Sequence, residues 1–375
     1  MDFTELIKEL TIGFTSFSWG NGVMILVGCI LLYLAIVKEY EPTLLMPIGF
    51  GCILANLGMS YDNGFMKVIY DAGITTELFP LLIFVGVGAM IDFRPLMAMP
   101  EMVLLGAAGQ FGIYATLILA VVLGFNIKEA ASIGVIGAID GPTAIFVASK
   151  LAPQMLGPIA VAAYSYMSLI PVIQPPIMRI FTTRKERLIR MDYIAHPVSK
   201  AAVIAFPIVV TVVVSLVAPS AAPLIATLML GNFLKECGVV DRLSKAAQNE
   251  IINIATLFLA LAIGSTMTAA NFINLQTLGV LVLGLIAFVI DTIAGLFFGK
   301  LMSLVTGGKI NPLIGACGIS AFPMAGRISA RMALDEDYDN FILMHAMGSN
   351  TAGQLGSVIA GGLLLALVAG VTGII

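Results

Sequence analysis

Long apolar runs follow one another along almost the whole of this 375-residue chain. A membrane-spanning helix needs about 20 mostly apolar residues, and runs of this kind lie near residues 101–124, 201–218 and 276–299. Only 11% of the residues are charged, whereas a soluble globular chain carries about 25%. These features exclude a water-soluble domain and a disordered chain. The sequence therefore predicts an all-α polytopic membrane protein with about ten or more hydrophobic segments.

The few charges indicate partners and orientation. A net charge of −3 offers no basic surface to phosphate, so nucleic acid is not expected as a partner. Lys and Arg gather in the polar connection 180–200, again in 235–249, and again at Lys300 and Lys309. Each cluster follows the previous one after two apolar runs. The positive-inside rule therefore predicts that the loop 180–200 is cytoplasmic.

An internal repeat is visible in the apolar sequence. Residues 80–90 resemble 257–267, and residues 135–146 resemble 313–324 at nearly the same separation along the chain. Two copies of one unit with interrupted helices are typical of secondary transporters. If every run spans once, the copies are parallel, and if one run re-enters, they are inverted. We favour inverted repeats.

These patterns divide the chain into five segments. An interfacial helix is expected in 1–20, where apolar residues recur at helical spacing between charged ones. The segments are the interfacial helix 1–20, scaffold spans in 21–74, a first repeat in 75–180 with a helix broken at Asp140, a cytoplasmic loop and connecting spans in 181–250, and a second repeat in 251–375 with a helix broken between Asn311 and Ser320.

Asp140 is the residue that most strongly indicates function. It lies in an otherwise uncharged apolar stretch, and a charge at the membrane centre costs about 2.5–3.5 kcal/mol on insertion scales. Gly141 and Pro142 follow directly, so the helix should break there and leave free carbonyl groups. A carboxylate beside carbonyl oxygens suits a hard cation, which we take to be sodium. The alternative is an Asp that only caps the following half-helix.

The second repeat supplies neutral oxygen atoms and one positively charged side chain. Asn311 precedes a proline and reads as a helix cap, and Gly315 and Ser320 follow it in an interrupted run. These residues add ligands without a second negative charge. Arg327 ends the run and is either the counter-charge of Asp140 or a fork for an incoming carboxylate. A snorkelling interface arginine is the alternative.

Two further residues have two readings each, and the role of a third is open. Asn350 lies in a polar break of the last apolar run and is either an ion ligand or an amide that packs helices. Tyr166 follows the break at Asp140 and either donates a proton or is a buried tyrosine with a satisfied hydroxyl. Asp291 lies inside an apolar run, and its role stays open.

Several long strings in this chain resemble one family. They are IGAIDGPTAIFVASKLAP (136–153), AYSYMSLIPVIQPPIMR (163–179), GNFLKECGVVDRLSKAAQNEIINI (231–254), NPLIGACGISAFPMAGR (311–327) and MHAMGSN (344–350). The family comprises the β subunits of sodium-pumping biotin-dependent decarboxylases, which act on oxaloacetate, methylmalonyl-CoA, glutaconyl-CoA or malonate. The resemblance runs from about residue 75 to the C-terminus.

The resemblance implies a mechanism. Such a subunit receives carboxybiotin from a partner chain, releases carbon dioxide, consumes a proton and moves sodium outward in an elevator-like carrier. The sodium ligands or their close supports would be Asp140, Asn311, Gly315, Ser320 and Asn350. Tyr166 and Arg327 would serve proton and carboxybiotin handling, together with Asp140 as a catalytic residue.

The resemblance also implies an assembly. The cofactors are Na⁺ and a biotin carried by a partner, not bound covalently here. The expected partners are a biotin-carrier subunit, a carboxyltransferase subunit and a small membrane subunit, in an oligomeric complex of the bacterial cytoplasmic membrane. The compact chain favours an acyl-CoA as the acid that feeds the pump.

Two other functions fit the composition, the repeat and Asp140 equally well. One is a sodium-coupled secondary transporter of an organic anion without decarboxylase activity. The other is a sodium/proton antiporter in which Asp140 alone performs the exchange. Only the family strings separate these functions from the decarboxylase pump.

Overall fold

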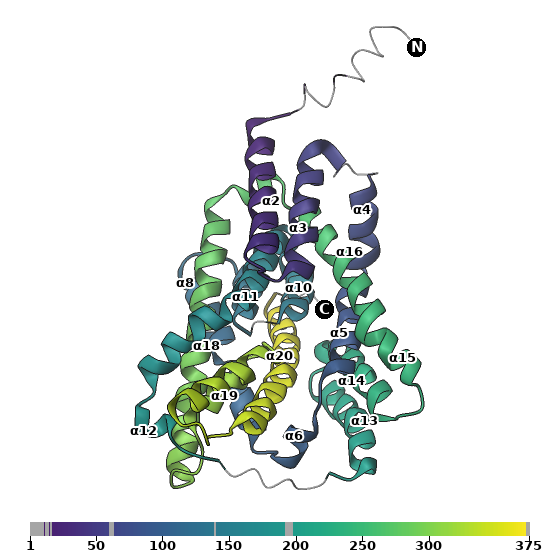
Figure 1. The fold of residues 1–375 in the computed structure, drawn as a ribbon. Helices are drawn as coiled ribbons and strands as arrows, with labels where there is room; N and C mark the ends of the chain where they lie inside the picture. The colour runs from purple at the N-terminus through teal and green to yellow at the C-terminus, as the bar shows by residue number, and fades with distance from the viewer. Residues whose placement is uncertain are drawn as a thin grey trace.

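A computed structural model describes residues 11, 15, 17–59, 64–138, 140–191 and 198–372 of the chain. Every regular element in these ranges is helical, and long helices such as α2 (Trp19–Val37), α3 (Pro42–Leu54) and α16 (Ile252–Ser265) run roughly along the long dimension of the molecule (Figure 1). This arrangement confirms the predicted all-α membrane class. The interfacial helix expected in 1–20 lies almost entirely outside the described residues.

The elements are labelled α for α-helices and η for 3-10 or π segments. In the first half they are α2 (Trp19–Val37), α3 (Pro42–Leu54), η1 (Ala55–Met59), α4 (Phe65–Tyr70), η2 (Asp71–Thr75), α5 (Leu78–Met90), α6 (Arg94–Ala98), α7 (Met102–Ala108), α8 (Phe111–Val122), α9 (Ile127–Gly134), η3 (Val135–Ala138), α10 (Gly141–Leu151), η4 (Pro153–Met155), α11 (Leu156–Phe181) and α12 (Arg184–Arg187). In the second half they are α13 (Lys200–Val217), η5 (Pro219–Ala221), α14 (Ala222–Glu236), α15 (Asp241–Ala246), η6 (Ala247–Ile251), α16 (Ile252–Ser265), α17 (Ala269–Phe272), α18 (Leu275–Val305), η7 (Pro312–Gly318), α19 (Met324–Glu336) and α20 (Leu343–Thr372).

Within the described ranges, eight helices are long and apolar enough to cross a membrane. The count rises to nine if the pair Phe65–Thr75 and Leu78–Met90, bent by 58°, forms one span. The number of apolar runs in the sequence is larger because several runs fold into short pieces. The run around Asp140, for example, divides into α9, η3 and α10.

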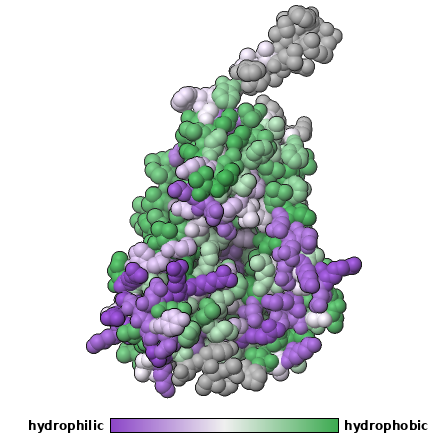
Figure 2. Space-filling model, viewed as in Figure 1, coloured by the Kyte–Doolittle hydropathy of each residue, from purple (hydrophilic) through white to green (hydrophobic). Residues whose placement is uncertain are grey.

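Hydrophilic side chains gather at one end of the molecule. Figure 2 places them over the lower half of the view, where Figure 1 shows α12, α15 and α19, whereas apolar surface covers the upper half. Lys300 near the end of α18 lies 3.2 Å from Glu186 of α12. Two of the basic clusters in the sequence therefore lie at the same end, as their alternation with apolar runs predicts.

A polar network joins the α12 region to α19. Arg187 Nε lies 2.7 Å from Glu336 Oε1, and Arg190 Nε lies 2.6 Å from Asp337 Oδ2. The hydrogen bond from Arg187 lowers the pKa of Glu336, and the bond from Arg190 lowers the pKa of Asp337. A carboxyl group with a lowered pKa contributes stability above its ordinary pKa and loses it only as pH falls through the lowered value. The network therefore keeps its charges throughout the neutral range.

The span Met102–Val122 is broken between α7 and α8. Gln110 lies in the break and donates from Nε2 to Gly318 O at 3.1 Å and Gly353 O at 3.3 Å. Asp291 of α18 is fully buried and accepts the backbone N–H of Gly112, the second residue of α8. The first N–H groups of a helix have no partner inside it, so Asp291 satisfies one of them within the bundle.

Gly318 is a position where the packing leaves no room for a side chain. A Cβ atom there would lie 2.2 Å from Leu105 O. We predict that Gly318→Ala lowers the free energy of unfolding by about 1–3 kcal/mol, the usual cost of overpacking a core. The measurement is the midpoint of thermal unfolding in detergent. The control is Gly370→Ala in α20, where a Cβ atom meets nothing within 4 Å. Equal midpoints for the two variants would contradict this prediction.

Candidate functional site

The two broken segments of the chain meet each other inside the bundle. Ser320, two residues beyond η7, donates its backbone N–H to Ala138 O at 3.1 Å, and its hydroxyl donates to the same carbonyl. Ala138 ends η3, just before Asp140 and the start of α10. The interruption of the first repeat and that of the second are thus joined by hydrogen bonds.

Local sequence explains the break at Asp140. Pro142 has no backbone N–H to donate, and Asp140 adopts an extended conformation at φ −117° and ψ 96°. The chain passes from the 3-10 turns of η3 into the first turn of α10 through this residue. The predicted break is therefore found at the predicted position, with Asp140 as the N-cap of α10.

The Asp140 carboxylate is anchored through one oxygen. Oδ2 accepts hydrogen bonds from Thr143 Oγ1 at 2.6 Å, Gln354 Nε2 at 2.9 Å and Ser357 Oγ at 3.1 Å. Oδ1 accepts none from the described residues, although the residue is only 6% exposed. Three neutral donors stabilise the negative charge and fix the orientation of the carboxylate. A residue that served only as a helix cap would not need the two donors from α20.

A cavity of about 590 Å³ opens beside Asp140. Side chains from α3, α5, α10, α11, α16, α19 and α20 surround it. The lining comprises Glu41, Thr43, Leu44, Ile83, Val87, Met90, Asp140, Gly141, Pro142, Tyr164, Met167, Ile252, Asn253, Thr256, Ser320, Phe322, Pro323, Arg327, Met347 and Gln354. Acid, amide and hydroxyl oxygens share this cavity with one guanidinium group, so it can receive a cation and an anion.

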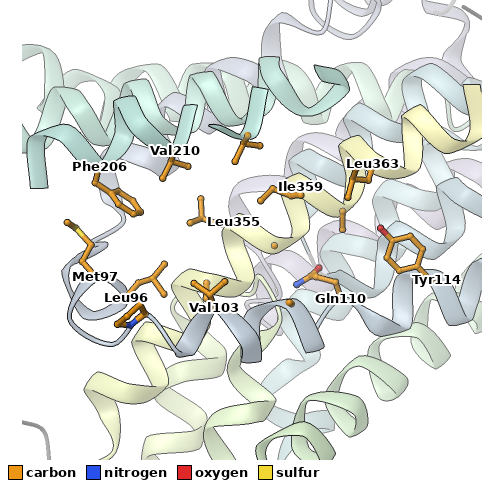
Figure 3. Close-up of a pocket in the computed structure, with 16 residues that line it drawn as sticks. Leu96, Met97, Val103, Gln110, Tyr114, Phe206, Val210, Leu355, Ile359 and Leu363 are labelled. Atoms are coloured by element: carbon orange, nitrogen blue, oxygen red, sulfur yellow. The ribbon is translucent and has the colours of Figure 1, made fainter. Parts of the chain in front are cut away.

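A second cavity is larger but chemically different. It measures about 650 Å³ and lies between the α6–α7 region, α13 and α20, with apolar side chains such as Phe206, Val210 and Leu355 pointing into it (Figure 3). Its lining includes no charged residue, and the amide of Gln110 is bonded to backbone carbonyls. An ion has no counter-charge there, so the cavity beside Asp140 is the better candidate site.

Arg327 lines the cavity from α19. Its side chain is exposed and forms no ion pair with a carboxylate of the described residues. The structure therefore shows no ion pair between Arg327 and Asp140, although one of the two predicted roles of Arg327 was the direct counter-charge of Asp140. Its guanidinium group is free to receive a carboxylate from outside the chain.

Tyr166 does not line the cavity. The side chain is half-buried, and its hydroxyl donates to Leu281 O of α18, so the hydroxyl is satisfied within the bundle. Tyr164, which precedes Tyr166 by two residues on the same helix, lines the cavity instead. Residues two apart on a helix point in directions about 200° apart, so only one of the two tyrosines can face Asp140.

Asn311 and Gly315 shape η7 rather than the cavity wall. Asn311 accepts the N–H of Leu313 at 3.0 Å and donates to the carbonyls of Arg187 and Ile189, both at 2.9 Å. A Cβ atom on Gly315 would lie 2.1 Å from Gly295 O. These two predicted ligands therefore hold η7 against the α12 region and α18.

Asn350 reaches the second break from α20. Its amide donates to Cys317 O at 3.2 Å and Ile319 O at 2.7 Å. Its Oδ1 atom is buried and has no hydrogen-bond partner among the described residues. Asn350 therefore supports the backbone that carries Ser320 and retains one free oxygen.

Sequence reasoning missed several polar residues of the site. Gln354 and Ser357 follow Asn350 at intervals of four and three residues, so the three form a polar stripe on one helix face. That stripe was the available signal. Glu41 and Tyr164 have no such signal in the sequence, because their approach to Asp140 depends on how α3 and α11 pack.

A family model matches residues 20–368 of the chain. Its description is the Na⁺-transporting oxaloacetate decarboxylase beta subunit. The match covers both broken segments, the cavity lining and the polar network at α12.

Relatives of established name align over nearly the full length. The chain is 55% identical over 370 residues to the glutaconyl-CoA decarboxylase subunit beta of Acidaminococcus fermentans, covering 98% of each chain. It is 55% identical over 357 residues to the methylmalonyl-CoA decarboxylase subunit beta of Veillonella parvula, covering 95% of each chain. It is 45% identical to the oxaloacetate decarboxylase beta chain of Klebsiella pneumoniae over 413 aligned positions, covering 93% of this chain and 95% of the relative.

Proposed function

The chain belongs to the family of β subunits of Na⁺-transporting decarboxylases, and from this premise we propose how it works. It decarboxylates carboxybiotin that a partner chain delivers, consumes a proton, and couples this reaction to outward movement of sodium. The observation that carries the proposal is the cavity in which Asp140, Ser320 and Arg327 meet. A carboxylate for a cation and a guanidinium for an anion line the same cavity.

Sodium binds at the break in the first repeat. Asp140 supplies Oδ1, because its Oδ2 is occupied by three hydrogen bonds. Ser320 supplies a neutral oxygen from the second break, and Asn350 supports that break through its bonds to Cys317 and Ile319. Asn311 and Gly315 support the site indirectly, because they hold η7 in place. Oxygen ligands of this kind suit a hard cation.

Arg327 binds the carboxylate of carboxybiotin at the exposed side of the cavity. Carboxybiotin supplies the bond that breaks: its N–C bond cleaves, carbon dioxide leaves, and the ring nitrogen takes a proton. A guanidinium group binds a carboxylate through two parallel hydrogen bonds, so Arg327 orients this group next to Asp140. Tyr166 serves the proton transfer after its hydroxyl leaves Leu281 O, a rearrangement in keeping with a moving carrier.

The shared cavity explains coupling. A proton that enters to complete decarboxylation meets the same carboxylate that holds sodium, and burial favours the neutral form of an acid once its cation has left. Movement of one charge against 100 mV costs about 2.3 kcal/mol. The decarboxylation reaction provides the free energy for that movement. The two broken segments belong to the moving carrier, and the spans of 21–74 belong to the fixed scaffold.

We expect the purified complex in proteoliposomes to take up sodium-22 when free carboxybiotin is added. Carbon dioxide release should require sodium, since one carboxylate serves both processes. Uptake and gas release are measured on the same vesicles, and vesicles without the complex are the control. Sodium uptake driven by an organic anion without carbon dioxide release would favour the secondary transporter. Exchange of sodium for protons without either substrate would favour the antiporter.

Purification of the native complex also tests the proposed partners. A biotin-carrier subunit, a carboxyltransferase subunit and a small membrane subunit should co-purify from native bacterial cytoplasmic membranes. The loop 180–200 lies in the cytoplasm, where the biotin carrier approaches. The high identity to two acyl-CoA decarboxylase subunits supports an acyl-CoA as the acid that feeds the pump.

A further inference from the structure

The larger cavity, between the α6–α7 region, α13 and α20, has no task in the proposed mechanism. It is elongated: Figure 3 shows Met97 and Phe206 toward one end and Gln110 and Tyr114 toward the other. Its volume of about 650 Å³ lies within the range of small-molecule sites, about 300–1,000 Å³. Apart from Gln110 and Tyr114, only apolar side chains and one glycine line it. An occupant must therefore be largely apolar and carry no charge.

The cavity opens on an apolar face of the molecule. Val103, which lies in the candidate span Met102–Val122, lines the cavity and is 51% exposed. The opposite wall is α13, an apolar candidate span in which only Val203 and Pro207 are buried. In a membrane-spanning chain, the surroundings of such an opening are the hydrocarbon chains of the bilayer. A ligand can therefore enter by lateral movement within the membrane.

Gln110 gives an independent indication of a ligand. The residue is 4% exposed, and its Nε2 donates to the carbonyls of Gly106, Gly318 and Gly353 at 3.1, 3.1 and 3.3 Å. Because three carbonyl oxygens face this atom, it is the nitrogen of the amide, and the other terminal atom is the oxygen. That Oε1 atom is buried and accepts no hydrogen bond from the described residues. Buried polar atoms in native proteins are nearly always bonded, so the occupant should supply a donor.

Tyr114 places a second polar group at the same end of the cavity. It follows Gln110 by four residues, which is about one helical turn, so the two side chains are neighbours on one face. The amide oxygen of Gln110 can only accept a hydrogen bond, whereas the tyrosine hydroxyl can also donate one. The pair therefore complements a head group that both donates and accepts. A hydroxyl group does both without carrying a charge.

We propose that this cavity binds a neutral lipid of the bilayer whose head group is a hydroxyl. The hydroxyl donates to Gln110 Oε1 and accepts from the Tyr114 hydroxyl, and the hydrocarbon chain lies between α13 and α20 against side chains such as Val210 and Leu355. A phosphate or an ionised carboxylate has no counter-charge in the lining, so phospholipid head groups and fatty-acid anions are excluded. This inference goes beyond the proposed function, and its test requires neither sodium nor carboxybiotin.

The first test uses the purified complex in lipid nanodiscs and hexadecanol with a photoreactive diazirine in its chain. We expect mass spectrometry to locate the label on lining residues of α13 or α20. Unlabelled hexadecanol should displace the probe. Its methyl ether should compete about tenfold less well, because it leaves the buried oxygen of Gln110 without a donor, and hexadecanoate should compete no better than the ether. Equal competition by the alcohol and the ether, or by the alcohol and hexadecanoate, would overturn the proposal.

The second test compares Val210→Trp with Val213→Trp. Val210 lines the cavity, whereas Val213 on the same helix is 53% exposed and does not. The two variants therefore add the same ring to α13 inside and outside the cavity. Labelling should fall at least about tenfold in Val210→Trp, because the ring takes the space of the chain, and it should stay at the wild-type level in Val213→Trp. Tyr114→Phe should lower the affinity for hexadecanol several-fold.

Size-exclusion chromatography verifies that each variant keeps the assembly, and the competition on the wild type does not depend on any variant. Equal labelling in the two tryptophan variants would overturn the proposal, because the probe would then bind the outer surface of α13. A wild-type label found only outside the cavity lining would overturn it as well.

Discussion

Asp140→Asn should reduce sodium-dependent decarboxylation of free carboxybiotin by roughly 100-fold or more, which corresponds to at least about 2.7 kcal/mol. Asparagine has the same shape and keeps one carbonyl oxygen, but it carries no charge. The donors from Thr143, Gln354 and Ser357 now bond to Asp140 Oδ2, and they can still bond to an amide oxygen. Under the proposed mechanism, the loss therefore falls on the binding of sodium by Oδ1.

The measurement is carbon dioxide release as a function of sodium concentration in the reconstituted complex. Asp335→Asn is the matched control, because Asp335 is exposed near the end of α19 and outside the cavity lining. Size-exclusion chromatography verifies that both variants keep the assembly. Sodium-stimulated turnover at the wild-type level in Asp140→Asn would remove this residue from the site.

The break at Asp140 could be predicted because its causes are local. A proline without an N–H, a glycine and an acid in adjacent positions determine the backbone there whatever surrounds them. The membrane class could be predicted for a similar reason, because long apolar runs occupy most of the chain. The apolar helices long enough to span a membrane and the helix break with Asp140 as N-cap both follow from these local sequence features.

The composition of the cavity wall could not be predicted in the same way. Tyr164 and Tyr166 have the same chemistry, and which one faces Asp140 is set by the rotation of α11 against α18. Glu41 lies about a hundred residues before Asp140 in the sequence, and only the packing of α3 brings it to the cavity. Asn311 stands in a recognised motif, yet its amide is used by the carbonyls of Arg187 and Ile189.

Placement of Arg327 and Asp140 in one cavity has a consequence for coupling. An anion at Arg327 and a cation at Asp140 attract each other, and inside a protein that attraction is stronger than in water. Each therefore favours binding of the other. By linkage, the change in affinity must be the same in both directions. If Arg327 binds the carboxylate as proposed, its removal affects carboxybiotin directly and sodium only through this coupling.

Arg327→Ala should lower turnover of free carboxybiotin by about 100-fold, because a bidentate, charge-assisted contact is lost. The sodium-22 binding constant, measured without carboxybiotin, should change by less than about threefold, because no oxygen ligand is removed. Arg331→Ala provides the matched control: Arg331 lies one turn further along α19, is exposed and does not line the cavity. Both of its values should remain near the wild type.

The two readouts in Arg327→Ala separate its possible roles. If sodium binding fell more than carboxybiotin turnover, Arg327 would act through the cation site, and the assignment of the anion to this side chain would be wrong. If Arg331→Ala lost as much turnover as Arg327→Ala, the effect would belong to the charge of α19 rather than to the cavity. The expected order, a large loss for the anion and a small one for the cation, requires that the guanidinium group contact the carboxylate itself.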